Sequence, residues 1–144
     1  MRALGVDLGG RRIGLALSDP TGTVAQPWKA IAPKGGGDAV AGAAQAVAET
    51  ARALGVEVVV VGLPRHMNGQ EGEGARVARA VAADLRERLG LRVELWDERL
   101  TTVAAERALR EGGVSARRRR EKVDKMAAAL ILQGFLDARR GRPA

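Results

Sequence analysis

The fold of this chain is decided near its start by the stretch Ala3-Leu4-Gly5-Val6-Asp7-Leu8-Gly9-Gly10-Arg11-Arg12-Ile13-Gly14-Leu15-Ala16-Leu17. It contains two short apolar runs, Ala3–Val6 and Ile13–Leu17, with Gly9 and Gly10 between them. Glycine adopts a positive φ at little steric cost, so this pattern predicts two strands joined by a tight turn. We therefore expect a β-hairpin, with Asp7 at the point where its first strand ends.

Three further strands are expected. Val24–Ile31 can return as a third strand, and Pro27 inside it favours an edge position because proline has no backbone N–H. Val56–Gly62 contains four consecutive valines, which are typical of a strand buried on both faces. Leu91–Trp96 is the fifth predicted strand and leads directly into Asp97-Glu98-Arg99.

Four helices are expected between and after these strands. The first can be capped by Asp38, and the first two stop at Gly55 and Gly90. Ser115–Arg120 is expected to be a basic connector before the last helix, and residues 141–144 are expected to fray. The four predicted helices cover approximately residues 38–54, 75–89, 101–111 and 121–139.

The order β-β-β-α-β-α-β-α-α predicts an α/β fold, with a five-stranded mixed sheet and helices packed on its faces. A chain of 144 residues suits one domain, which we expect to cover residues 1–140. Cysteine is absent, which excludes disulfides, thiolate zinc sites and a cysteine nucleophile and suits a reducing compartment. No apolar stretch approaches the length of a membrane span. The sequence predicts a cytoplasmic protein with no membrane partner.

The net charge of +7 is typical of proteins that bind polyanions. Arginine supplies most of the positive charge and binds phosphate through its planar fork. A GC-rich genome would also raise the arginine count, but it would not remove the net charge. Nucleic acid is therefore the expected partner, and the sequence leaves the oligomeric state open.

Three acidic positions are candidates for chemistry. Asp7 ends an apolar strand beside a flexible turn, although it could simply cap that turn. Asp97 and Glu98 follow the fifth strand, and two neighbouring carboxylates beside Arg99 can hold a hard cation. A local ion pair and a helix cap are the alternative explanation. Asp124 lies over the apolar stripe of the last helix, where it is expected to be paired, protonated or metal-bound. The alternative to a metal site is a salt bridge to Arg120 or Lys125. Together they suggest a site for Mg²⁺ or Mn²⁺, which activates water in phosphodiester hydrolysis.

Basic residues accompany these acids. The run Arg117–Arg120 surrounds the start of the helix that carries Asp124, and it is interpreted as a phosphate clamp rather than a solvated patch. The chain has few aromatic residues on which bases could stack, so backbone and shape recognition is expected. The candidate nucleic-acid contacts are Arg11, Arg12, Arg99, Arg117, Arg118, Arg119, Arg120, Lys122 and Lys125.

Several segments together resemble the YqgF family, in order and over nearly the whole chain. The resemblance implies an RNase H-like fold with Asp7, Glu98 and Asp124 as the acidic triad. It also implies a nuclease that matures the 5′ end of pre-16S ribosomal RNA, or a resolvase that cuts four-way DNA junctions. The matching segments are Gly5–Gly9, Arg12–Asp19, Val60–Pro64, Met67–Gly72, Trp96–Thr102 and Asp124–Ala128.

The chain departs from many RNase H-like nucleases at the second acid. Those proteins carry it at the end of the fourth strand, where this chain has Gly62-Leu63-Pro64. If the fifth strand lies beyond the fourth, Glu98 starts about 10 Å to the side of Asp7, at two strand spacings. Glu71, in the preceding loop, is the alternative second ligand.

Two other classes of function compete with a nuclease. A non-catalytic RNA-binding factor for ribosome assembly needs only the basic surface. An actin-like ATPase or sugar kinase is suggested by Asp7-Leu8-Gly9, but such proteins enclose their nucleotide between two related domains. This chain is long enough for only one domain of that kind.

Overall fold

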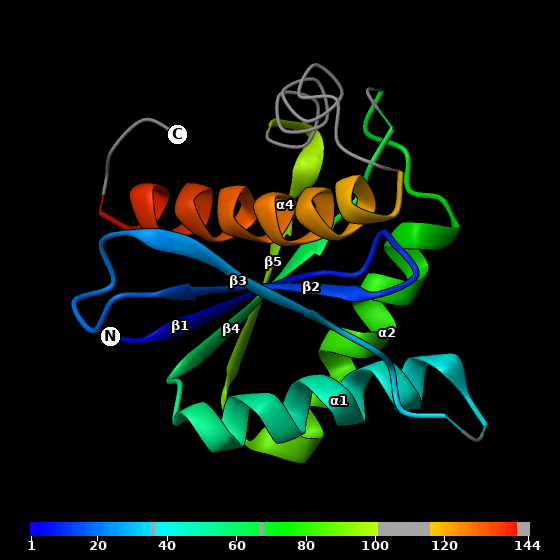
Figure 1. Ribbon diagram of the computed structural model, residues 1–144, viewed down its shortest axis with the longest axis horizontal. Coiled ribbons are helices and arrows are strands. Elements are labelled where there is room, and N and C mark those ends of the chain that lie inside the picture. The colour runs from blue at the N-terminus through cyan, green and yellow to red at the C-terminus, as the bar shows by residue number, and fades with distance from the viewer. Residues whose placement is uncertain (36, 67, 101–115, 141–144) are drawn as a thin grey trace.

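The computed structural model describes residues 1–35, 37–66, 68–100 and 116–140, with backbone only at residues 100 and 116–124. A five-stranded sheet lies between helix α4 on one face and helices α1 and α2 on the other (Figure 1). The strands are β1 (Ala3–Asp7), β2 (Ile13–Ser18), β3 (Ala25–Ile31), β4 (Val58–Leu63) and β5 (Arg92–Asp97). The helices are α1 (Ala39–Leu54), α2 (Glu73–Leu89), the short 3₁₀ helix η1 (Glu98–Leu100) and α4 (Ala116–Arg139).

The sheet is mixed, as the sequence predicts, with the strand order β3-β2-β1-β4-β5. Strands β1 and β2 form the expected antiparallel hairpin, in which Asp7 lies opposite Gly14. Strand β4 runs parallel to β1 on one side and parallel to β5 on the other. The carboxyl ends of β1, β4 and β5 therefore share one edge of the sheet, which we call the carboxyl edge.

The prediction that Pro27 occupies an edge strand is confirmed, because β3 is the outermost strand beside β2. The pairing of β2 with β3 shifts along its length. Leu15 lies opposite Lys29, whereas the next residue, Ala16, lies opposite Pro27. Trp28 is thus an extra residue on β3, as in a β-bulge.

The helix ends follow their capping residues. The side chain of Asp38 accepts a hydrogen bond from the backbone N–H of Val40 at the start of α1. Gly55 and Gly90 follow α1 and α2 with φ values of 65° and 63°, in the left-handed region where glycine is favoured.

The predicted basic connector over Ser115–Arg120 is wrong, because α4 already begins at Ala116. Alanine and arginine are good helix formers, and a run of positive charge does not by itself interrupt a helix. The expected helix over 101–111 and the expected fraying of 141–144 lie outside the described residues. None of the described helices is long and apolar enough to cross a membrane.

Alternate residues of each strand face opposite sides of the sheet. Leu4, Val6, Val59 and Val61 belong to the core beneath α1 and α2. A second core lies beneath α4, and its buried members are Ala3, Ala16, Val58, Val60, Ala128, Ile131, Leu132, Phe135 and Leu136.

Helix α4 lies very close to β1 at Gly5. A Cβ atom at this position would be 2.7 Å from the backbone oxygen of Ala128 and 2.8 Å from Cβ of Leu132. The C-terminal end of α4 is fixed by Arg140, which donates hydrogen bonds to the carbonyl oxygens of Gly22 and Thr23. Because that contact lies at the amino end of β1, the first turns of α4 lie toward the carboxyl edge.

Candidate active site

Asp7 ends β1 on the face of the sheet that α4 covers, since it continues the alternation of Ala3 and Gly5. It is buried, and its Oδ1 accepts a hydrogen bond of 3.0 Å from the backbone N–H of Gly9. Asp7 therefore does cap its own turn. A carboxylate has about four acceptor sites, so this hydrogen bond is compatible with a cation at the same group.

Glu98 brings its carboxylate toward Asp7 across β4. Gly62 pairs with Trp96 of β5, and Val61 beside it pairs with Val6, so Gly62 is level with Asp7. A Cβ atom at Gly62 would lie 2.9 Å from Oε2 of Glu98. The carboxylate of Glu98 thus lies directly above β4, and the sideways gap expected from the strand order is reduced to about one strand spacing.

Asp97 precedes Glu98 but belongs to the opposite face of the sheet, because Val93 and Leu95 of the same alternation pack beneath α1 and α2. Its carboxylate pairs with Nη2 of Arg99 at 2.7 Å and with Nη1 of Arg65 at 3.6 Å. Hydrogen bonds from Arg99 hold the pKa of Asp97 below its ordinary value. Asp97 therefore serves an arginine cluster on the face away from Asp7.

Glu71, the alternative second acid, also belongs to this cluster. Its Oε2 lies 2.6 Å from Nη2 of Arg79 and 3.1 Å from Nη2 of Arg65. Hydrogen bonds from Arg79 and then from Arg65 lower the pKa of Glu71 to about 2. Arg65 thereby links Glu71 to Asp97, and the structure does not bring Glu71 together with Asp7.

Asp124 lies in the N-terminal half of α4. Its backbone is one turn, or about 6 Å along the helix axis, before Ala128, which contacts Gly5 of β1. That turn is displaced toward the carboxyl edge, where Asp7 lies. The side chain of Asp124, and with it the alternative of a salt bridge to Arg120 or Lys125, lies outside the described part of the chain.

The described side chains form only part of a metal site. Among them, no three histidine, cysteine, aspartate or glutamate residues lie together as a metal-binding group. Asp7 and Glu98 provide two carboxylates on one face, and both make interactions within the protein. Carboxylate oxygens are the donors that Mg²⁺ and Mn²⁺ prefer.

The predicted nucleic-acid contacts fall into three groups. Arg11 and Arg12 are exposed in the turn that follows Asp7, and Arg12 donates a hydrogen bond to the carbonyl oxygen of Ala30. Arg99 is held by Asp97, and Lys125 is half-buried in α4. The side chains that lie outside the described residues are Arg117, Arg118, Arg119, Arg120 and Lys122.

The sequence pattern does not identify Gly62 or Arg65 as candidate site residues. The one available signal for Gly62 is a glycine, in place of an acid, at the end of a valine run. Arg65 lies in a loop rich in glycine and proline, and its two acidic partners, Glu71 and Asp97, are far from each other in the sequence. No pattern of spacing predicts that contact.

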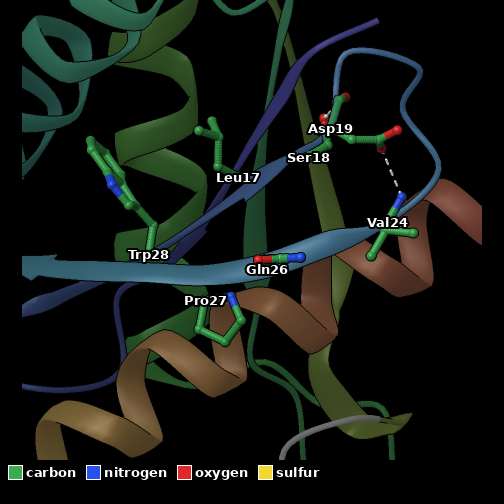
Figure 2. Close-up of a pocket in the computed structure, with 7 residues that line it drawn as sticks. All are labelled: Leu17, Ser18, Asp19, Val24, Gln26, Pro27 and Trp28. Carbon is green, nitrogen blue, oxygen red and sulfur yellow. Dashed lines mark hydrogen bonds between the residues drawn. The ribbon is translucent and has the colours of Figure 1, made fainter.

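A hollow of about 280 Å³ lies at the other end of the sheet, between β2 and β3 (Figure 2). Asp19 beside it accepts hydrogen bonds from the Thr21 hydroxyl and from the backbone N–H groups of Thr23 and Val24. These bonds keep the pKa of Asp19 well below its ordinary value. They close the β2–β3 turn, so this carboxylate has a structural role away from the carboxyl edge.

Solved structures support the fold. The structure of Thermus thermophilus RuvC in complex with a Holliday junction substrate superposes with a TM-score of 0.59 at 19% sequence identity, covering 98% of this chain and 97% of that chain. A second structure, of Thermus thermophilus RuvC, gives a TM-score of 0.53 at 17% sequence identity and covers 98% of this chain and 97% of that chain. At this level of identity the likeness establishes the RNase H-like fold.

Sequence relatives extend over nearly the full chain. A relative from Pelotomaculum thermopropionicum, named "Putative pre-16S rRNA nuclease", is 52% identical over 143 residues, which cover 99% of this chain and 90% of the relative. One of the same name from Geobacillus kaustophilus is 46% identical over 141 residues, covering 97% and 100%. The family model described as "RuvX: Holliday junction resolvase" matches residues 1–138. The chain therefore belongs to the RuvX family, which is the YqgF family that its motifs resemble.

Proposed function

We propose that this protein is a nuclease that hydrolyses phosphodiester bonds with a divalent metal ion held by Asp7, Glu98 and Asp124. The observation that carries the proposal is that two acids from distant parts of the sequence lie on one face of the sheet, about one strand spacing apart. Asp7 is buried at the end of β1, and the Glu98 carboxylate lies over Gly62 of the adjacent strand. The third acid is assigned from its helix position, one turn before the contact of Ala128 with Gly5.

The donor set fits Mg²⁺ or Mn²⁺, because both ions take carboxylate oxygens and complete their coordination with water and phosphate oxygens. When bound, such an ion lowers the pKa of a coordinated water and stabilises charge on the phosphate. The protein's own contribution is to hold the carboxylates in place. The backbone N–H of Gly9 orients Asp7, and the bare backbone of Gly62 gives room to Glu98.

The basic residues would bind the substrate backbone. Arg11 and Arg12 directly follow the strand that carries Asp7, and they are exposed. Arginine binds phosphate oxygens without reading the base, so these residues would position the nucleic acid rather than select its sequence. A nucleic-acid substrate would place the protein's action in the cytoplasm, and a chain without cysteine suits that reducing compartment.

The names of the curated relatives favour pre-16S ribosomal RNA as the substrate. Processing of its 5′ end is the reaction that the resemblance to the YqgF family implies. The description of the family model favours a second candidate, the four-way DNA junction. A junction resolvase makes two symmetric cuts, so this second candidate also requires a two-fold dimer. The two functions share their chemistry and differ in the shape of the substrate.

The test compares both substrates directly. Wild-type protein is incubated with a pre-16S rRNA fragment or a four-way DNA junction, in Mg²⁺, Mn²⁺ or EDTA. We expect metal-dependent cleavage that is faster on the RNA and that is lost in Asp7→Asn. Asp84→Asn is the matched control, because it removes only an exposed ion pair with Arg88.

Each other outcome has a definite meaning. Full cleavage by Asp7→Asn would contradict the metal assignment. Faster cleavage of the junction by a dimer would favour the resolvase. RNA binding without cleavage by wild-type protein, across these ions and substrates, would favour a non-catalytic assembly factor.

A further inference from the structure

Gly62 lies in the middle of the proposed metal site although it has no side chain to contribute. Its neighbour Val61 pairs with Val6 of β1, and Gly62 itself pairs with Trp96 of β5. Gly62 therefore separates the strand that carries Asp7 from the strand that leads to Glu98. An acid at this position of β4 would lie between the strand that carries Asp7 and the strand that leads to Glu98.

The space above Gly62 is already filled. A Cβ atom there would lie 2.9 Å from Oε2 and 3.0 Å from Cδ of Glu98. It would also lie 2.5 Å from Cδ1 of Ile131 in α4. Non-bonded carbon atoms are optimally 3.5–4.0 Å apart, so even an alanine at position 62 would have to displace one or both neighbours.

Close helix packing alone does not account for this glycine. Gly5 has that role on β1, since the atoms that its Cβ would meet all belong to α4, in Ala128 and Leu132. Gly62 differs because one of its two neighbours is the carboxylate of Glu98, which comes from the end of β5. The two contacts can be separated experimentally, because the atom of Ile131 involved is the terminal methyl of a side chain.

We infer that Gly62 is a positioning residue for Glu98. Its missing side chain leaves a space through which the Glu98 carboxylate reaches the position beside Asp7 that an acid on β4 would otherwise hold. Glu98, which follows β5, thereby supplies the second acid of the proposed site at a level where β4 has only Gly62. This inference rests on the proposed metal-dependent nuclease function.

The test isolates the contact between position 62 and Glu98. Ile131→Val removes Cδ1 and is the reference, and Gly62→Ala/Ile131→Val then adds a methyl group whose closest remaining neighbour is the carboxylate of Glu98. Mn²⁺ binding is measured by calorimetry without nucleic acid, alongside cleavage and thermal unfolding. We expect Mn²⁺ to bind about 10- to 100-fold more weakly to the double variant than to Ile131→Val, as is usual when the support of a metal ligand is disturbed.

A second set of variants moves the acid to β4. Ile131→Val/Glu98→Ala removes the carboxylate and should bind Mn²⁺ poorly. Gly62→Asp/Ile131→Val/Glu98→Ala places a carboxylate on β4 in the vacated space. We expect it to recover Mn²⁺ binding by about tenfold or more over the variant without the new aspartate.

The results separate this inference from the proposed function. One outcome would overturn the inference and leave the metal site standing. In it, wild-type protein and Ile131→Val bind Mn²⁺, Asp7→Asn binds it weakly, and Gly62→Ala/Ile131→Val binds it as tightly as Ile131→Val does. If wild-type protein neither binds Mn²⁺ nor cleaves nucleic acid, both are overturned. If Gly62→Ala/Ile131→Val does not fold, the test depends on Gly62→Asp/Ile131→Val/Glu98→Ala. Failure of this variant to bind Mn²⁺ more tightly than Ile131→Val/Glu98→Ala would also overturn the inference.

Discussion

The two faces of the sheet are built from the same strands but have different compositions. The face beneath α1 and α2 stays apolar along β1 and β4, through residues such as Val6 and Val61. The face beneath α4 is apolar from Ala3 and Val58 as far as Ala16 and Val60. At its carboxyl end it carries the buried Asp7. Burying a carboxylate is unfavourable unless it is compensated. The proposed function assigns the chemistry to this carboxyl end of the α4 face, whereas the α1/α2 face would only stabilise the fold.

The sharpest test of this comparison uses two neighbouring acids on opposite faces. Glu98→Gln should reduce cleavage about a thousandfold, because a metal ion contributes several kcal/mol to the stabilisation of the transition state. Asp97→Asn should keep cleavage within about tenfold of wild type, since an asparagine oxygen can still accept hydrogen bonds from Arg99. Single-turnover cleavage rates measure both.

The reverse order of effects, with Asp97→Asn the more damaging change, would break the assignment of chemistry to the α4 face. Circular dichroism on both variants serves as the control, because each should keep the wild-type secondary structure.

A core substitution on the other face should have the opposite signature. Leu85 of α2 is fully buried beneath the sheet, so Leu85→Ala should lower the free energy of unfolding by about 2–5 kcal/mol. Urea denaturation measures this loss. The cleavage rate of the folded fraction should not change at temperatures well below the unfolding midpoint. A specific loss of kcat in fully folded Leu85→Ala would show that the α1/α2 face also takes part in chemistry.

Much of this arrangement could be predicted from the sequence, because it depends on local pattern. The hairpin follows from the glycines between two apolar runs, and the buried strand β4 follows from its valines. The start of α4 was not predicted, because the arginine run was interpreted by its charge rather than by its helix propensity.

The position of Glu98 could not be predicted for a different reason. Counting strands places Glu98 two spacings from Asp7, and only the three-dimensional structure shows its carboxylate above Gly62. The pairing of Glu71 with Arg79 and Arg65 is also a tertiary contact. Such contacts depend on how a loop closes after its strand, which has no periodic signal in the sequence.

The exposed arginines next to Asp7 allow a test of substrate positioning. Arg11→Gln/Arg12→Gln should weaken binding of nucleic acid and lower the slope of log K against log salt concentration by about 1 for each phosphate contact that is lost. Binding titrations at several salt concentrations measure this slope. The cleavage rate at saturating substrate should be nearly unchanged. An unchanged slope would mean that these arginines do not contact phosphate.

The smallest expected effect concerns the arginine cluster on the other face. The pKa of Glu71 is lowered to about 2 from an ordinary value of 4.5 by hydrogen bonds from Arg79 and Arg65. Its contribution to stability is therefore complete above pH 4.5 and is lost as the pH falls toward 2. Glu71→Gln should be slightly less stable than wild type at pH 7, and the difference should shrink over that range. Thermal unfolding at several pH values measures it, and a difference that is constant with pH would contradict the ion pair.

The construction of β3 has a consequence for the behaviour of the protein at high concentration. An outermost strand exposes backbone donors and acceptors on which a strand from another molecule can add. Here Pro27 lacks an N–H, Trp28 is an extra residue that interrupts regular spacing, and Lys29 places a charge on the same strand. Each of these features discourages strand-to-strand association, so β3 protects the molecule against aggregation through its open edge.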